Sequence, residues 1–365
     1  MILHLLPDDK FSDYVIHQFS EPEMCSEFVL MATEEHASYF KNIAAVKVID
    51  PSQSDRMTLL FDSLADYSAI VLHGLFFPWC EAILRHVPAQ VKVAWVFWGG
   101  EVYSRKDLRA SFLSKRSQRL LRLHQWMQRL KHKKPIPHFE LPRELFQRID
   151  YCLTDIHEDY EFVRAYCGFE AKELWYNYYS IEETLGDLRD QTVNGNNILI
   201  GNSCTLECNH WDGFRAAQKL QGEDSQIIVP LSYGEPWLRR GLLRIGKSMF
   251  GKRFRPLVDF MPRDEYNKII ESCAVVIMPH YRPQAFGNIL TALWLGSRVF
   301  MSERSHLFKF YQRIGLHVFS IENDLKKDKV LPLPADEREE NRRIIASLYD
   351  KEVMKERIKT MVDAL

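Results

Sequence analysis

Short apolar runs alternate with longer segments of helical period along the whole chain. Runs that are rich in Val, Ile and Leu and apolar throughout are typical of strands covered on both faces, as in parallel sheets packed between helices. The alternation therefore predicts an α/β protein. The strands expected in the first half of the chain lie at residues 2–6, 27–32, 46–50, 69–73, 91–98, 151–154 and 173–176.

A polar stretch at residues 180–197 interrupts this alternation and indicates a domain boundary. A second series of strands is expected at residues 198–201, 226–231, 255–260, 274–279, 298–301 and 317–321. Because 365 residues exceed what one hydrophobic core normally organises, we expect domains at residues 1–185 and 186–345 and a C-terminal helix at 346–365. Both domains are expected to be Rossmann-like, with ligand-binding loops facing each other across a cleft.

The charge and cysteine content narrow the class of protein. Lys and Arg total 48 against 49 Asp and Glu, so the net charge of −1 does not favour a nucleic-acid partner for the whole molecule. The seven cysteines are scattered and contain no C-x-x-C pair, which favours reduced thiols in a cytosolic compartment. No run approaches the roughly 18 to 20 apolar residues of a membrane span. Any contact with a membrane is therefore expected at its surface.

The expected strand at 274–279 leads into a turn with the chemistry of a phosphate site. An Arg and small residues precede an apolar helix, whose free N-terminal amides and positive dipole end suit a diphosphate. An ordinary strand-to-helix turn is the alternative interpretation. The candidate donor-binding residues of this turn are His280, Arg282, Gln284, Gly287 and Asn288.

Two more loops of the same domain carry side chains that suit a nucleotide sugar. Small and polar residues directly after the strand at 198–201 can line a phosphate-bearing ligand. An aromatic and hydroxyl pair after the strand at 226–231 suits a base or a sugar ring. The candidate donor-binding residues of these loops are Gly201, Asn202, Ser203, Ser232, Tyr233 and Gly234.

In the first domain, Trp98 and Glu101 follow an expected strand. An aromatic face stacks on sugars, and a carboxylate can accept a proton from an attacking hydroxyl. The alternative is a Glu favoured at a helix N-terminus by the helix dipole. His73 ends another buried strand and is the second candidate base, although a lone His there is more often structural. The acceptor-binding candidates are Trp98, Gly99, Gly100 and Tyr103.

Two further patterns carry less weight. Residues 241–248 satisfy the phosphate-loop spacing, but they lie inside one expected helix at 237–250, whereas that loop must follow a strand. Cys204, Cys208 and His210 have spacing that resembles a metal site, yet no fourth ligand stands at a recognisable distance. We therefore expect neither nucleoside-triphosphate hydrolysis nor a zinc site.

Residues 105–134 are strongly basic, with eleven Lys and Arg and one Asp. Leu residues recur there at helical spacing, so an apolar stripe accompanies the positive charge along one helix. This combination favours adsorption to an anionic bilayer surface. A core-facing helix with a solvated basic face is the alternative. The candidate membrane-contacting residues are Lys115, Arg116, Arg119, Arg122 and Trp126.

These loops, in this order, resemble glycosyltransferase family 56, the bacterial 4-acetamido-4,6-dideoxygalactose (Fuc4NAc) transferases that act on lipid II of the enterobacterial common antigen pathway. The family has Asp where this sequence has Glu101, and it lacks the Cys and His residues of the loop at 204–210. The matching pieces span both domains and are HGLF at 73–76, WGGEVY at 98–103, ILIGNS at 198–203, PLSYG at 230–234 and RPQAFG at 282–287.

The resemblance implies a GT-B fold and a division of labour between its domains. The second domain would bind a dTDP-sugar, with Arg282, Gln284 and Gly287 at the phosphates and Tyr233 near the nucleoside. The first domain would receive a polyprenyl-diphosphate-linked saccharide. The sequence contains no D-x-D, so we expect no metal or other cofactor, with fixed positive charge assisting departure of the diphosphate instead.

Within this picture Glu101 is the first candidate for a general base. If the reaction retains the anomeric configuration, no such base is needed and Glu101 would position the acceptor. We expect a peripheral protein on the cytoplasmic face of the bacterial inner membrane, with no nucleic-acid partner. The alternatives are a transferase of the same fold that uses a UDP- or GDP-sugar for lipopolysaccharide or capsule, and a non-catalytic membrane-bound scaffold.

Overall fold

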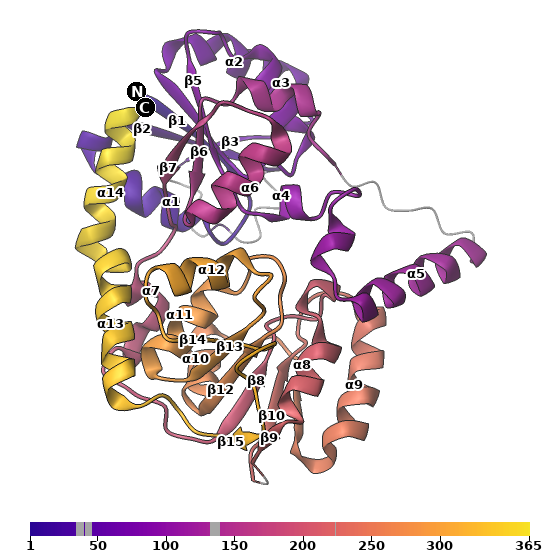
Figure 1. The fold of residues 1–365 in the computed structure, drawn as a ribbon. Coiled ribbons are helices and arrows are strands. Elements are labelled where there is room, and N and C mark those ends of the chain that lie inside the picture. The colour runs from indigo at the N-terminus through magenta and orange to yellow at the C-terminus, as the bar shows by residue number, and fades with distance from the viewer. Residues whose placement is uncertain (34–39, 41–45, 132–138, 223) are drawn as a thin grey trace. The chain divides into compact units, whose positions relative to one another are not determined.

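The computed structural model describes residues 1–33, 40, 46–131, 139–222 and 224–365. The chain divides into two compact units, each assembled from separate segments (Figure 1). Unit 1 consists of Met1–Arg105, Pro137–Tyr179 and Lys351–Leu365, and unit 2 consists of Lys106–Ile136 and Ser180–Asp350.

Within the described residues, unit 1 contains a seven-stranded sheet in the order β3-β2-β1-β4-β5-β6-β7, and every neighbouring pair of strands is parallel. Its strands are β1 (Ile2–Pro7), β2 (Ser26–Met31), β3 (Lys47–Ile49), β4 (Ala69–His73), β5 (Lys92–Val96), β6 (Tyr151–Thr154) and β7 (Lys172–Trp175). Its helices are α1 (Ser12–Phe19), α2 (Ser54–Ser63), α3 (Pro78–His86), α4 (Gly100–Tyr103), α6 (His157–Cys167) and α14 (Lys351–Ala364).

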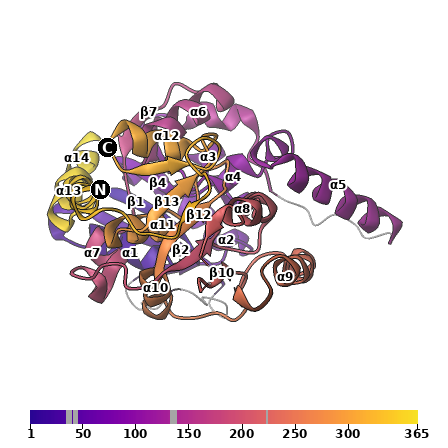
Figure 2. The same cartoon turned by 60° about the horizontal axis from the view of Figure 1, so that its bottom comes forward.

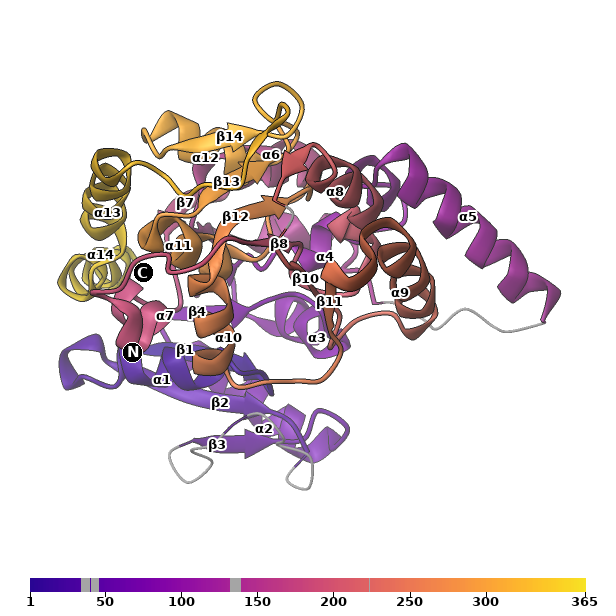
Figure 3. The same cartoon turned by 90° about the horizontal axis from the view of Figure 1, so that it is seen from below.

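The described part of unit 2 contains a six-stranded parallel sheet in the order β11-β10-β8-β12-β13-β14 (Figure 3). Its strands are β8 (Asn197–Ile200), β10 (Ile227–Pro230), β11 (Phe254–Leu257), β12 (Cys273–Met278), β13 (Arg298–Met301) and β14 (Val318–Ser320), and β9 (Leu220–Gln221) pairs separately with β15 (Asp328–Lys329). Its helices are α5 (Lys115–Leu130), α7 (Ile181–Leu185), α8 (His210–Ala217), α9 (Pro236–Phe250), α10 (Arg263–Glu271), α11 (Phe286–Leu295), α12 (His306–Arg313) and α13 (Ala335–Tyr349).

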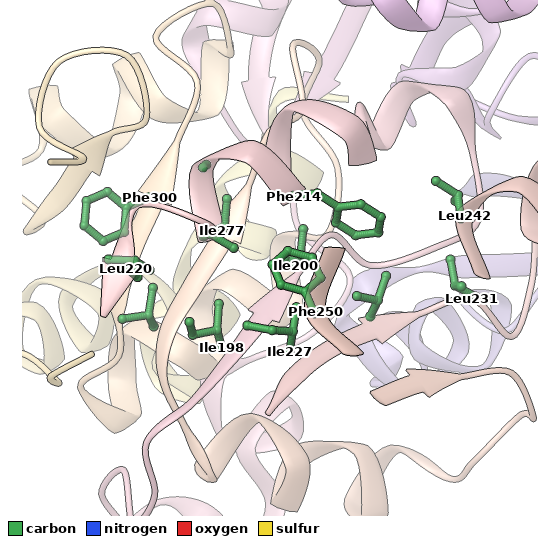
Figure 4. Close-up of a cluster of buried hydrophobic side chains, with 14 of the residues drawn as sticks. Ile198, Ile200, Phe214, Leu220, Ile227, Leu231, Leu242, Phe250, Ile277 and Phe300 are labelled. Atoms are coloured by element: carbon green, nitrogen blue, oxygen red, sulfur yellow. The ribbon is translucent and has the colours of Figure 1, made fainter. Parts of the chain in front are cut away.

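Each sheet has its own hydrophobic core. The strands β4 and β12 are buried along their whole length, as their uninterrupted apolar runs predict for strands covered on both faces. In unit 2, Ile198, Ile200 and Ile277 from the sheet pack with Phe214 of α8 and Phe250 of α9 (Figure 4). The prediction of an α/β protein with two parallel sheets is confirmed.

The expected domain borders and the compact units differ in two segments. Residues 105–134 are predicted in the N-terminal domain, but Lys106–Ile136 clusters with unit 2. The helix in this segment is shorter than expected, and residues 132–134 lie outside the described residues. The C-terminal helix expected at 346–365 begins only at Lys351, because residues 346–349 belong to α13 and Asp350 between α13 and α14 has an extended backbone. Ile358 and Met361 of α14 belong to the core of unit 1.

Candidate active site

In unit 2, three loops follow the neighbouring strands β10, β8 and β12, which are parallel and therefore release their loops at one edge of the sheet. Backbone hydrogen bonds of 2.8 Å run from the Cys204 amide to the Tyr233 carbonyl and from the Glu235 amide to the Cys204 carbonyl. From the third loop, Gln284 Nε2 donates to Oδ1 of Asn202 at 3.2 Å. The structure thus brings together the three loops in which the sequence predicts donor-binding residues.

Gly234 allows the loop after β10 to pass close to the loop after β8. Its φ is +119°, and an added Cβ would lie 2.3 Å from the carbonyl oxygen of Cys204. Only glycine fits this backbone approach. The adjacent Tyr233 is 56% exposed, and its hydroxyl accepts a long hydrogen bond of 3.4 Å from Asn202 Nδ2. An exposed aromatic ring is thereby presented beside the edge of the sheet.

The remaining predicted residues of these two loops have local roles. Gly201 directly follows β8 with a φ of +67°. Ser203 is buried, and its hydroxyl lies 3.3 Å from the sulfur of Cys208. Ser232 is partly buried, and its carbonyl accepts a hydrogen bond of 3.0 Å from Arg239.

Cys208 lies at the centre of a polar cluster between the loops after β8 and β12. Its sulfur lies 3.3 Å from both Asn202 Oδ1 and Gln284 Nε2. Burial alone would raise the pKa of the Cys208 thiol, but the nearby His210 and hydrogen bonds from Ser203 and other neighbours outweigh burial and lower this pKa. Among the described residues, no group of three or more His, Cys, Asp or Glu side chains could hold a metal ion. Gln284 connects the two loops through its contacts with Asn202 and Cys208.

The turn between β12 and α11 is partly exposed from residue 281 to residue 288. Arg282 donates to the Pro283 carbonyl at 3.4 Å and forms no ion pair within the described residues. The helix α11 begins after Ala285, whose φ of +62° turns the chain into the helix. The first amides of a helix have no intrahelical partner, and Gly287 and Asn288 lie in this first turn. A positive side chain and unpaired amides therefore occur at the same turn, as an anion requires.

His280 is the buried member of this turn. It is 2% exposed, and its Nε2 has no hydrogen-bond partner among the described residues. Burial, together with the charge of Arg282, lowers the pKa of His280 to about 3. The imidazole is therefore neutral at physiological pH, and the positive charge of the turn comes from Arg282.

In unit 1, Glu101 follows β5 and is 6% exposed. Its Oε1 accepts hydrogen bonds from the backbone amide of Trp98 at 2.9 Å and from the indole of Trp95 at 3.2 Å. The strand expected at 91–98 ends at Val96. The Glu101 carboxylate stabilises the turn that follows by accepting the hydrogen bond from the Trp98 amide. This geometry matches the alternative interpretation of a Glu at a helix N-terminus and favours a structural role over proton transfer.

His73 has both ring nitrogens engaged inside unit 1. Its Nε2 lies 3.1 Å from Nδ1 of His4, and its Nδ1 lies 3.1 Å from the hydroxyl of Tyr178. Burial, followed by repulsion from His4, lowers the pKa of His73 well below its usual range. A general base must reach the proton that it removes, and neither ring nitrogen of His73 is available for one here. The geometry favours the structural role that the sequence left open.

The predicted acceptor residues lie around the same turn. Trp98 is partly exposed and donates through its indole nitrogen to the Tyr178 hydroxyl. Phe11 packs edge-on against Trp98 at 5.4 Å and stacks on Tyr178 at 4.9 Å. Tyr103 is buried and donates to the carboxylate of Asp159. Gly99, with a φ of +90°, connects Trp98 to α4, and Gly100 is the first residue of that helix. Trp98 is therefore a partly exposed aromatic side chain at this edge of the sheet.

Sequence reasoning missed the residues that fix these loops from a distance. Arg109 forms ion pairs with Glu207 at 2.8 Å and Glu235 at 3.2 Å, one residue in each of two predicted donor loops. Asn209 accepts a hydrogen bond from the Ser114 amide at 2.9 Å. These partners are separated by about a hundred residues or more in the chain. No local periodicity or motif signals such pairs.

Comparison with known proteins gives a family and a fold. The chain matches the model of a protein family described as 4-alpha-L-fucosyltransferase, glycosyl transferase group 56, over residues 9–347. This match covers nearly the whole chain and every strand of both sheets except β1. It agrees with the resemblance found in the sequence motifs.

Several solved structures share the fold at low sequence identity. A glycosyltransferase from Rickettsia africae aligns with a TM-score of 0.63 and 8% identity, over 100% of this chain and 97% of that chain. Sucrose-phosphate synthase from Thermosynechococcus elongatus gives 0.61 and 9%, over 100% and 98%. The Anabaena HepE protein in complex with UDP gives 0.60 and 12%, over 100% of both chains. The expected GT-B fold is confirmed.

Proposed function

Since the chain belongs to glycosyltransferase family 56, the 4-alpha-L-fucosyltransferase group, we propose that it transfers Fuc4NAc from a dTDP carrier to a polyprenyl-diphosphate-linked saccharide. The carrier and the acceptor follow from the motif resemblance. The observation that carries the proposal is the edge of the unit 2 sheet, where three loops meet beside Arg282 and the first turn of α11. The HepE structure, which contains UDP, supports a nucleotide-linked donor for this fold.

In this proposal the donor diphosphate binds Arg282 and the free amides at Gly287 and Asn288. Gln284 reaches the same space while bound to Asn202. Tyr233, with its exposed ring, contacts the nucleoside. Departure of the diphosphate is then assisted by a fixed positive charge and fixed amide dipoles, which lose no free energy to reorganisation during the reaction.

The acceptor saccharide is proposed to stack on Trp98 in unit 1. Glu101 and Tyr178 each hold Trp98 by a hydrogen bond, one to its backbone amide and one to its indole. We assign Glu101 to holding this acceptor loop. If the reaction retains the anomeric configuration, no general base is needed, and Glu101 would position the acceptor through this loop. The reaction is proposed to take place at the cytoplasmic face of the bacterial inner membrane, with the protein bound peripherally.

The test is a panel of dTDP-, UDP- and GDP-sugars measured for thermal stabilisation of the protein. A ligand that binds only the folded state raises its stability by about 2.7 kcal/mol at a hundred times its Kd. We expect dTDP and its sugar to raise the melting temperature and UDP to leave it unchanged.

The rival functions give other results in the same panel. Protection by UDP or GDP alone would assign the chain to the transferases for lipopolysaccharide or capsule and refute the dTDP donor. A non-catalytic scaffold predicts no shift with any nucleotide. Radiolabelled transfer to a polyprenyl-diphosphate-linked saccharide then tests the acceptor separately from the donor.

A further inference from the structure

The helix α5 exposes an apolar face that nothing in the described structure covers. Among the described residues, five of the large apolar side chains that are exposed lie on this one helix. Their exposed fractions range from 37% to 61%, and they are Leu120, Leu123, Trp126, Met127 and Leu130. Their spacing of three and four residues places them along one side of the helix. An exposed apolar face of this kind marks a surface of interaction.

The opposite side of α5 is fixed to unit 2. Ser117 is buried, and the ring of His124 stacks on Trp237 of α9 with centroids 4.0 Å apart. The guanidinium of Arg116 lies over Trp211 of α8 at 5.0 Å. Figure 2 shows the helix extending away from α8 and α9 toward its C-terminal end. The packed side of α5 also includes Leu121, which is partly buried against the core of unit 2. The core-facing alternative therefore accounts for this side of the helix but not for the five large apolar side chains that are exposed.

Positive charge accompanies the exposed apolar face. Lys115, Arg119, Arg122 and Arg129 are exposed and form no ion pair within the described residues. The sequence contains no acidic residue between positions 108 and 139. The occupant of this face must therefore be apolar where it meets the leucines and anionic where it meets the basic side chains.

We infer that α5 is a docking surface for an anionic lipid bilayer, with its leucines and Trp126 entering the boundary between headgroups and acyl chains. A bilayer supplies both an apolar layer and anionic headgroups, and each basic residue near such a surface adds about 1 kcal/mol of attraction. A second copy of the chain would oppose cations to cations, and a nucleic acid would leave the apolar face in water. This inference rests on the peripheral membrane binding in the proposed function and deepens it by naming the surface that binds, and it does not depend on the donor sugar.

The contacts of α5 and of the segment before it show which unit would be attached to the bilayer. The segment leading into α5 is tied to the donor loops through Arg109 with Glu207 and Glu235, and through the Ser114 amide with Asn209. Arg304 also donates to the Ser111 carbonyl at 3.0 Å. The docking surface is thus part of the unit that carries the proposed donor site.

The test is co-sedimentation of the full chain with vesicles of phosphatidylcholine, with and without phosphatidylglycerol. A charge-reversal variant changes Lys115, Arg119, Arg122 and Arg129 to Glu and leaves Arg116 in place, because Arg116 packs on Trp211. Its matched control reverses four exposed basic residues of unit 2 outside α5, which are Lys326, Lys327, Lys329 and Arg343. We expect the α5 variant to bind anionic vesicles at least about 100-fold more weakly and the control to change binding far less.

The apolar contribution is tested with a second pair of variants. Replacing Leu123 and Leu130 with Ser is expected to weaken binding about tenfold, because both side chains would otherwise leave water in the bilayer. Leu59→Ser on α2 is the control, since Leu59 is 69% exposed but stands alone. Circular dichroism and thermal melting verify that each variant folds, which is expected at exposed positions.

Two outcomes would overturn the inference. Wild-type protein that stays in the supernatant with anionic vesicles, or a charge-reversal variant that sediments like the wild type, removes the bilayer as the partner. A concentration-dependent dimer that the Leu123 and Leu130 variant abolishes, without vesicle binding by the wild type, assigns the face to a second copy. These measurements contain no nucleotide, so their failure is distinct from failure of the dTDP panel.

Discussion

The carboxyl edges of the two sheets carry similar residue types. Their polar side chains differ, because the candidate bases of unit 1 are buried and hydrogen-bonded within the protein while two candidate donor-binding residues of unit 2 are exposed at least in part and have few partners. In unit 1, Glu101 and His73 are buried and bonded to Trp98, Trp95, His4 and Tyr178. In unit 2, Arg282 and Tyr233 are partly or largely exposed, and Arg282 has only a weak contact with its neighbouring carbonyl. A charged residue after a strand is therefore not by itself a catalytic candidate. If hydrogen-bond partners within the protein occupy its polar atoms, the residue stabilises the fold. If they do not, its polar atoms can bind a ligand.

The largest effect is expected for Glu101→Ala in unit 1. This change leaves the Trp98 amide and the buried Trp95 indole without their acceptor, which costs about 3 kcal/mol of unfolding free energy. Glu101→Gln keeps an acceptor oxygen and should lose about 1 kcal/mol. Urea unfolding of both variants measures the difference. An Ala variant with wild-type stability but no turnover would make Glu101 a catalytic base and break the contrast between the two edges.

An intermediate effect is expected for Arg282→Ala in unit 2, and it concerns binding. Hydrogen bonds to a charged group contribute about 1.5 to 3 kcal/mol, so dTDP affinity should fall about 30-fold by calorimetry. The free energy of unfolding should change by less than about 0.5 kcal/mol, because the side chain makes few contacts. Arg343→Ala on α13, which is also exposed, is the control. Unchanged affinity together with lost stability would show that this turn, like that of unit 1, is satisfied internally.

The smallest effect per residue is a pH dependence, to which His4 of unit 1 and His280 of unit 2 contribute beside other buried histidines such as His73. Burial lowers the pKa of His4 to about 3, and burial with Arg282 does the same for His280. The unfolded chain protonates these groups near pH 6.5, whereas the folded protein does so only near pH 3. Stability is therefore lost as the pH falls between these values.

Between pH 7.5 and pH 5.5 each of the two should account for about 1.4 kcal/mol of the loss. Chemical unfolding of the wild type, His4→Gln and His280→Gln at both pH values measures how much of the lost unfolding free energy each His causes. A His280 variant whose pH dependence equals that of the wild type would mean that His280 is open to water. The turn of unit 2 would then differ even more from the closed network of unit 1.

The fold followed from the sequence wherever burial alone determines the pattern. Strands such as β4 and β12 are covered on both faces, so their composition identifies them without knowledge of their neighbours. The donor loops were also predictable as a group, because parallel neighbouring strands release their loops at the same edge.

Contacts between segments that are distant in the chain could not be predicted from the sequence. The pairing of Trp98 with Tyr178 depends on the order of strands, and that of Arg109 with Glu207 and Glu235 depends on how the segment leading into α5 packs on unit 2. Neither leaves a periodic signal in the chain. The amino-acid type of Glu101 likewise gives no measure of its burial, so the catalytic and capping interpretations remained equal until its partners were known.

The helix α14 has a consequence for how the protein is made. It supplies Ile358 and Met361 to the core of unit 1, although all of unit 2 precedes it in the chain. During synthesis the strands of unit 1 are therefore made early. Their sheet lacks the apolar side chains of α14 until the ribosome has translated all of unit 2. The nascent chain must keep an incomplete first half soluble while the second half emerges, which makes the two halves dependent on each other before any substrate is bound.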